Sequence, residues 1–201
     1  ENFAKIAKAS NIKLIHISTD YVFDGTNHIP YTERDKTNPQ SVYGSTKLAG
    51  EQALQHINPS NSIIIRASWV YSSFGNNFVK TMLRLANERT ELGVIVDQIG
   101  TPTYARDLAK VILEIIPELN NENLEVYHFS NKGVSSWYDF AKAIFDIKAI
   151  DIKLNAIETS QYPTAAKRPF YSVLNKHKIE NRFQIEIPNW RDSLRDCLQK
   201  L

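Results

Sequence analysis

Short apolar runs alternate with amphipathic segments along most of the chain. The runs are rich in Ile, Val and Phe and carry few polar residues, as expected of strands that are covered on both faces in a parallel sheet. We expect strands over 12–18, 62–71, 92–96, 125–131 and 152–158.

The intervening segments repeat apolar residues every three or four positions, which predicts helices. In one of them Phe78, Met82, Leu85 and Ala86 share a face. We expect helices over 1–10, 41–57, 76–89, 105–119, 135–147 and 189–201. Strands that alternate with helices predict an α/β fold with a mostly parallel sheet. The polar stretch that contains Gly25, Pro30 and Pro39 is expected to be irregular, and so is most of 159–188.

Composition narrows the function classes. The chain has 201 residues, of which 42% are hydrophobic and 23% charged, and this suits one soluble domain or slightly more. The net charge of +2 is spread along the chain, which argues against a nucleic-acid partner. No apolar run reaches the roughly 20 residues that span a bilayer, so no membrane partner is expected. The single Cys197 cannot form an internal disulfide, which favours a cytoplasmic protein.

One tyrosine and one lysine stand out. Tyr43 and Lys47 are four residues apart on a predicted helix and therefore share a face. A cation beside a phenol favours the phenolate, which makes tyrosine a usable proton donor or acceptor. This spacing alone is weak evidence, because many helices carry it as solvated polar residues. The context strengthens it: Thr19 and Asp20 end the strand 12–18, and parallel sheets bind ligands at the carboxyl ends of their strands. Thr19 as a cap and Asp20 as a turn residue are the simpler alternatives.

Four segments carry a family resemblance: "STDYVFDG" (18–25), "YGSTKLAGE" (43–51), "IIRASWVYSSFGNNFVKTML" (64–83) and "DQIGTPTYARDLA" (97–109). They resemble the extended short-chain dehydrogenase/reductase family, and within it the reductases that act on dTDP-4-dehydrorhamnose. The resemblance covers about residues 1–175 and is thinner after 150.

The resemblance implies an NADPH- or NADH-dependent reduction of dTDP-4-dehydro-L-rhamnose to dTDP-L-rhamnose, a step toward cell-surface polysaccharide. Tyr43 would protonate the 4-keto oxygen as hydride arrives. Thr19 would form a hydrogen bond with the substrate oxygen, and Lys47 would lower the pKa of Tyr43. Tyr43 and Lys47 would also contact the cofactor. The family's substrate contacts map onto Asp20, Tyr21 and Trp69.

Three further residues fit a sugar-nucleotide substrate. Asn77 opens a helix whose free N–H groups suit a diphosphate, although simple capping explains it equally. Gln98 lies on a loop that would form a wall of the cleft. Arg168 suits a diphosphate or is an ordinary surface residue. Trp69 would pack on a sugar or base or, alternatively, belong to the core edge.

The five histidines show no ligand spacing, so no metal site is expected.

The Gly-rich turn that binds a dinucleotide is absent from this sequence. The resemblance places it before residue 1, so we expect an incomplete Rossmann-like, doubly wound sheet with a small C-terminal substrate lobe. Residues 1–150 would form the Rossmann-like part with interleaved substrate-binding segments, and 151–201 the rest of the lobe. Such a fragment is expected to bind NAD(P)H poorly, to be inactive alone, and to associate into a homo-oligomer through an open sheet edge.

Two alternatives remain. One is a sugar-nucleotide epimerase or dehydratase of the same superfamily, although dehydratases usually carry more acidic residues at this point than the single Asp20. The other is a non-catalytic binding subunit on the same fold. The presence of Thr19, Tyr43 and Lys47 together argues against the second alternative.

Overall fold

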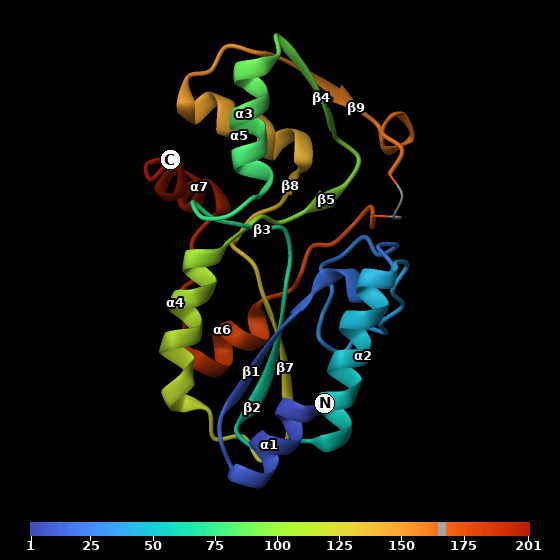
Figure 1. Ribbon diagram of the computed structural model, residues 1–201, viewed down its shortest axis with the longest axis vertical. Helices are drawn as coiled ribbons and strands as arrows, with labels where there is room; N and C mark the ends of the chain where they lie inside the picture. The colour runs from blue at the N-terminus through green and yellow to red at the C-terminus, as the bar shows by residue number, and fades with distance from the viewer. Residues whose placement is uncertain (165–167) are drawn as a thin grey trace.

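The computed structural model describes residues 1–164 and 168–201 and is elongated, with a parallel sheet at one end and a smaller part at the other (Figure 1). The sheet contains β1 (Leu14–Thr19), β2 (Ser62–Ala67) and β7 (Glu125–Phe129) in the order β1–β2–β7. Both pairings are parallel, so all three carboxyl ends face the smaller part. The predicted α/β class with a mostly parallel sheet is confirmed.

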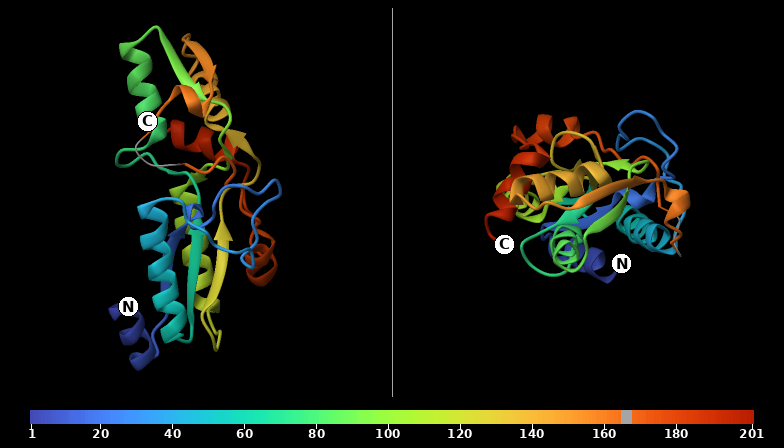
Figure 2. Two further views of the ribbon diagram at one scale, coloured as in Figure 1. Left: turned by 90° about the vertical axis from the view of Figure 1, so that its right-hand side faces the viewer. Right: turned by 90° about the horizontal axis from the view of Figure 1, so that it is seen from above.

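Helices cover both faces of this sheet, as the turned views also show (Figure 2). Ile64 of β2 packs with Ala4 and Leu54 from the helices of one face. Its neighbours Ile63 and Ile65 pack against the helices of the other face, because successive side chains of a strand point to opposite sides. The first face carries α1 (Asn2–Ser10) and α2 (Val42–Ile57), and the second carries α4 (Ala105–Ile115) with its 3₁₀ extension (Ile116–Glu118) and α6 (His177–Phe183).

The smaller part is built around a second apolar cluster that includes Tyr71, Phe140 and Leu194. Its helices are α3 (Phe78–Glu88), α5 (Trp137–Lys148) and α7 (Trp190–Leu198). Its strands form parallel pairs of β3 (Val70–Tyr71) with β6 (Thr103–Tyr104) and of β4 (Glu91–Ile95) with β9 (Lys153–Ile157), and an antiparallel pair of β5 (Ile99–Gly100) with β8 (Ser135–Ser136).

Several elements differ from the sequence-based expectation, among them the unexpected two-residue strands β5, β6 and β8. The strand expected over 62–71 stops after Ala67, because the chain turns there into the smaller part and Trp69 adopts a left-handed φ of 46°. A helix, α6, lies in a segment expected to be irregular; it has only seven residues and no side-chain cap at Lys176, so its sequence signal is weak.

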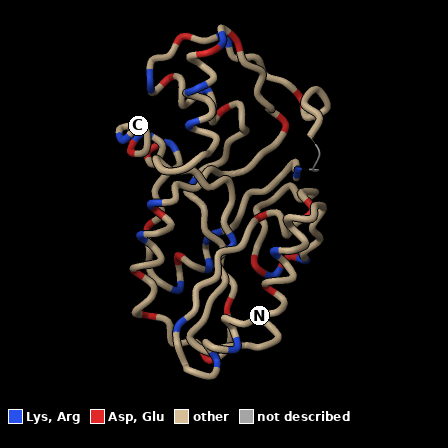
Figure 3. Tube along the Cα trace, in the orientation of Figure 1, with Lys and Arg blue, Asp and Glu red and all other residues tan. Residues whose placement is uncertain are grey.

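Lys and Arg are interspersed with Asp and Glu over both parts of the trace (Figure 3).

Candidate active site

The carboxyl end of β1 carries two buried polar side chains, Thr19 and Asp20. The Thr19 hydroxyl donates to Oδ1 of Asp20 (3.0 Å) and accepts from the backbone N–H of Tyr21 (3.2 Å). Thr19 thereby caps the 3₁₀ turn Asp20–Val22 that follows the strand. The capping alternative considered from the sequence is therefore observed, and a catalytic role of the same hydroxyl stays a prediction.

Asp20 has the most unusual environment at this edge. Burial raises the pKa of its carboxyl to about 7, although the hydroxyls of Ser172 and Thr19 act in the opposite direction. Its Oδ2 has no hydrogen-bond partner among residues 1–164 and 168–201, and neither does the hydroxyl of Ser18 on the same strand. The edge therefore contains two buried polar atoms whose hydrogen-bonding capacity the described residues leave unused.

Helix α2 brings Tyr43 to this edge. The Ser41 hydroxyl caps the helix by accepting from the Gly44 N–H (3.1 Å). A Cβ at Gly44 would lie 2.2 Å from the carbonyl oxygen of Tyr21, so only glycine permits this close approach. The rings of Tyr43 and Tyr21 meet edge to face at 5.7 Å between centroids, and 56% of Tyr43 is exposed. The phenol therefore lies beside the turn that follows β1 and is open to a ligand.

Lys47, one turn further along α2, is fixed directly to β1. Its Nζ donates to the carbonyl oxygen of Ile17 at 2.6 Å, two residues before Thr19. In the described part of the chain no hydrogen bond joins the Tyr43 hydroxyl to Lys47 or Thr19. The structure thus places all three residues predicted to be catalytic around the carboxyl end of β1, linked through Ile17 and Tyr21 rather than to one another.

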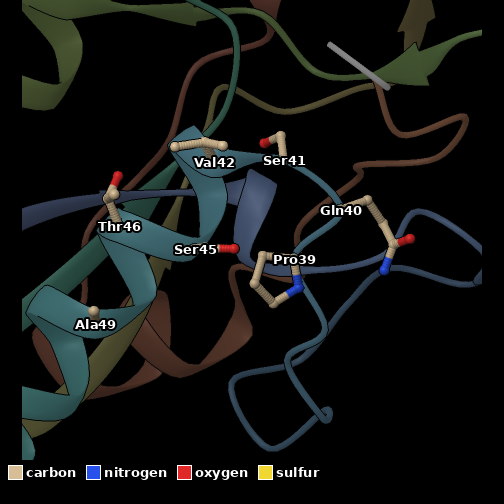
Figure 4. A pocket seen from close by; sticks show the side chains of 7 residues that line it. All are labelled: Pro39, Gln40, Ser41, Val42, Ser45, Thr46 and Ala49. Carbon is tan, nitrogen blue, oxygen red and sulfur yellow. The ribbon is translucent and has the colours of Figure 1, made fainter.

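A shallow hollow of about 560 Å³ lies along the outer side of α2, where small side chains leave room (Figure 4). It contains none of the predicted site residues, although Val42 on its wall precedes Tyr43 directly. Its lining residues are Pro39, Gln40, Ser41, Val42, Ser45, Thr46 and Ala49.

Trp69 lies where the chain leaves the sheet for the smaller part. Its indole stacks on Trp137 with 3.7 Å between ring centroids and an interplanar angle of 10°. A Cβ at Gly100 would lie 2.6 Å from the same ring. Trp69 is half-buried between these neighbours, so the structure gives it packing contacts beside any role toward a ligand.

Two predicted substrate residues are engaged in hydrogen bonds within the chain. The Asn77 side chain caps α3, accepting from the Lys80 N–H at 3.3 Å and donating to the Ser72 carbonyl oxygen at 2.7 Å. Gln98 is only 2% exposed, and its amide donates to the Thr159 hydroxyl at 3.1 Å. Both side chains thus have partners within the chain, and a role of either toward a substrate stays a prediction.

Arg168 lies at a second, more enclosed cavity of about 280 Å³ in the smaller part. Aromatic rings line this cavity together with a second arginine, Arg89. The charge of Arg168 lowers the pKa of Tyr21, against the larger rise that burial causes. The lining comprises Phe78, Thr81, Met82, Leu85, Arg89, Leu92, Gly93, Val94, Ile95, Trp137, Tyr162 and Arg168.

Sequence reasoning missed Arg89, Trp137 and Tyr162 as cavity residues. Trp137 begins a helix directly after two serines, which is a signal for a helix start and not for a ligand. No cluster of three or more His, Cys, Asp or Glu side chains suits a metal ion within the two described ranges. A search of the same residues for a helix long and apolar enough to span a membrane finds none.

Comparison with known proteins places this geometry in a family. The model of the RmlD substrate binding domain matches residues 1–201. The dTDP-4-dehydrorhamnose reductase of Sinorhizobium fredii is 44% identical over 200 residues, covering 96% of this chain and 67% of that protein. The reductase of the same name from Escherichia coli K12 is 44% identical over 209 residues, covering 100% and 70%. The chain thus spans about two thirds of the length of these relatives.

Comparison with solved structures supports the same family assignment. The dTDP-4-dehydrorhamnose reductase of Clostridium acetobutylicum superposes with a TM-score of 0.92 at 44% identity, covering 98% of this chain and 69% of that one. The Bacillus anthracis reductase, solved in complex with NADP, gives a TM-score of 0.93 at 37% identity, covering 100% and 70%. The resemblance drawn from the motifs around Thr19, Tyr43 and Trp69 is confirmed: the chain belongs to the RmlD substrate binding domain family.

Proposed function

We propose that this chain forms the proton-transfer and substrate-binding part of an NAD(P)H-dependent reductase that converts dTDP-4-dehydro-L-rhamnose to dTDP-L-rhamnose. The observation that carries the proposal is the docking of α2 on the end of β1. Lys47 on the Ile17 carbonyl and Gly44 on the Tyr21 carbonyl hold the exposed phenol of Tyr43 against the ring of Tyr21, two residues after Thr19. The names of the relatives with 44% identity support the same reaction.

The chain's own residues would perform the proton transfer. Tyr43 donates its phenolic proton to the carbonyl oxygen of the substrate. The Thr19 hydroxyl would hold that oxygen in place by turning its single proton to it from Oδ1 of Asp20. Lys47 uses one of its three N–H donors for the carbonyl oxygen of Ile17, and the other two are available for Tyr43 and the nicotinamide ribose. Bound NAD(P)H supplies the hydride. Tyr43 and Lys47 fit the nicotinamide end of that cofactor, whereas none of the seven glycines forms a Gly-rich turn for its pyrophosphate.

The second cavity would hold the nucleotide part of the substrate. Phe78, Trp137 and Tyr162 offer faces on which a base can stack, and Arg168 and Arg89 offer charge for a diphosphate. Asp20, Tyr21 and Trp69 would then line the path from this cavity to Tyr43. Asn77 would contribute by shaping the start of α3 and Gln98 by holding Thr159, since the side chains of both are already engaged.

The setting of the enzyme is part of the proposal. Cys197 is a buried free thiol, which fits a reducing cytoplasm. A homo-oligomer and the division of the chain near residue 150 also stay predictions. Both sides of that division contribute to the cluster of the smaller part, for example Phe140 and Leu194.

The test is an assay of the full-length protein with dTDP-4-dehydro-L-rhamnose and either NADPH or NADH, followed by the absorbance of the reduced nicotinamide and by product analysis. We expect oxidation of the cofactor and formation of dTDP-L-rhamnose. Tyr43→Phe should lower kcat about 10²–10⁴-fold, the usual contribution of a positioned acid. Tyr138→Phe on α5 is the matched control and should retain activity.

Other outcomes would reject the proposal in distinct ways. An epimerised or dehydrated sugar nucleotide without net oxidation of the cofactor would identify a related epimerase or dehydratase. Binding of the dTDP-sugar without any turnover would identify a non-catalytic binding subunit.

A further inference from the structure

A buried ion pair joins α2 to the middle strand of the sheet. Glu51 and Arg66 are 0% and 3% exposed. Arg66 Nε donates to Oε1 of Glu51 at 3.0 Å, and its Nη2 donates to Oε2 at 2.7 Å. This two-point geometry fixes the relative orientation of the two groups as well as their distance. Neither residue is part of the proton-transfer set described above.

The guanidinium of Arg66 is held on its other sides too. Its Nη1 lies 3.5 Å from Nε2 of His128, and Nδ1 of His128 lies 3.1 Å from the carbonyl oxygen of Tyr31. A carbonyl only accepts and a guanidinium only donates, so His128 carries its proton on Nδ1 and is neutral. Burial and the charge of Arg66 agree with this, since they lower the pKa of His128 to about 3. The Phe23 ring lies 5.2 Å from the guanidinium carbon. Arg66 is therefore a fixed point, contacted from α2, from β7 and from the loop after β1.

Glu51 belongs to the same stripe of α2 as the proposed catalytic side chains. Tyr43, Lys47 and Glu51 follow one another at intervals of four residues, so they lie along one face of the helix. Lys47 is fixed to Ile17 of β1, and Glu51 is fixed one turn further along. Two attachments one turn apart determine both the rotation of the helix about its axis and its position along that axis.

We propose that Glu51 and Arg66 are positioning residues for the reaction, an inference that rests on the proposed function. The pair sets the rotation and height of α2 so that Tyr43 and Lys47 meet the end of β1. Displacements of about 1 Å at a reacting group lower rates by about 10²-fold, which is why a rigid anchor matters at this place.

The test compares variants of the full-length protein. Glu51→Gln keeps the shape of the side chain and removes its charge, and Arg66→Lys keeps the charge and removes the two-point contact. We expect kcat to fall about 10-fold or more in each, with the KM for substrate changed less than about threefold. Ile115→Ala is the matched control: Ile115 is 1% exposed on α4, on the opposite face of the sheet, and should lower stability without changing kcat in the folded protein.

A double variant separates positioning from stability. Glu51→Leu with Arg66→Met replaces the pair by apolar side chains of similar size, which folded proteins often tolerate. A folded double variant with a reduced kcat supports the proposal, and one with the kcat of the wild type overturns it.

Hydrogen exchange of the α2 amides distinguishes this inference from the proposed function. We expect faster exchange confined to the first turns of α2 in Glu51→Gln and in the double variant, and unchanged exchange there in Ile115→Ala. Unchanged exchange in all three variants would overturn the positioning role. Absence of reductase activity in the wild type would instead overturn the proposed function.

Discussion

The carboxyl edge of the sheet and the cavity of the smaller part differ in the side chains they gather. At the edge, Thr19, Asp20 and Lys47 are tied to the backbone or to each other, and only Tyr43 is largely exposed. The cavity instead collects aromatic rings and arginines around an open volume. A rigid polar edge suits proton transfer and an aromatic cavity suits ligand recognition, so changes at the edge should act on kcat and changes in the cavity on KM.

The largest expected effect is at the edge. Lys47→Met removes the ammonium and its bond to Ile17, so kcat should fall about 10²–10³-fold while KM for the sugar nucleotide changes little. Lys153→Met is the control, since Lys153 pairs with Glu91 on the surface of the smaller part. Steady-state kinetics of both variants check this. A Lys47→Met enzyme altered only in KM would remove the contrast between the two regions.

The next effect belongs to the cavity. Arg168→Ala removes a charged donor, and the loss of a hydrogen bond to a charged group costs about 1.5–3 kcal/mol. We therefore expect KM for the dTDP-sugar to rise about 10–100-fold with nearly unchanged kcat. Arg84→Ala, which breaks an exposed pair with Glu88 on α3, is the comparison variant. Calorimetric titration with dTDP gives a second readout, and equal affinity in the Arg168 and Arg84 variants would show that the cavity does not bind the nucleotide.

A smaller effect is expected where the two regions meet. Gly100→Ala places a methyl group 2.6 Å from the Trp69 ring and 2.7 Å from the Ser172 hydroxyl, so the free energy of unfolding should fall by about 1–2 kcal/mol. Gly50→Ala on α2 meets nothing closer than 3.8 Å and should be neutral or stabilising. Urea unfolding measures the free energy of unfolding of both variants. A Gly100→Ala protein as stable as Gly50→Ala would mean that Trp69 moves freely.

The smallest effect concerns stability and pH at Asp20. Its carboxyl has a pKa of about 7 in the fold against an ordinary 3.8, so between these values the folded state holds a proton that the unfolded state has lost. This group's contribution to the free energy of unfolding therefore falls as the pH rises from about 4 to about 7. Relative to wild type, Asp20→Asn should therefore gain stability as the pH rises from about 4 to about 8. Thermal unfolding of Asp20→Asn and of wild type at both pH values tests this prediction. A difference in stability that does not change with pH would contradict a buried, neutral Asp20 carboxyl.

The elements that sequence predicts well are those whose own side chains determine them. The β-branched runs of β1 and β2 and the spaced apolar residues of α3 form hydrophobic patterns that depend only on the local sequence. The two-residue strands, such as Ile99–Gly100, form only because a partner lies beside them. The left-handed backbone of Trp69 has no local signature, since tryptophan rarely adopts it.

The candidate site divides in the same way. Thr19, Tyr43 and Lys47 were recognisable because fixed spacings place them at the end of a strand and on one helix face. Asn77 and Gln98 are expected at a ligand from the sequence. Their side chains also cap α3 and hold Thr159, and a role toward a ligand stays a prediction. Arg66 offered a signal that was overlooked: one charge inside the apolar run "SIIIRAS" requires a buried counter-charge, which proves to be Glu51.

The chain passes several times between the apolar cluster of the smaller part and the cluster on the α4 and α6 face of the sheet. Ala67 and Tyr71 lie in different clusters, and so do Tyr104 and Leu108, Phe129 and Phe140, and Ile187 and Trp190. Neither end of the molecule is therefore a continuous piece of polypeptide. A single protease nick cannot release one end as an autonomous module, and neither end can be cloned alone or exchanged with another protein by a simple splice.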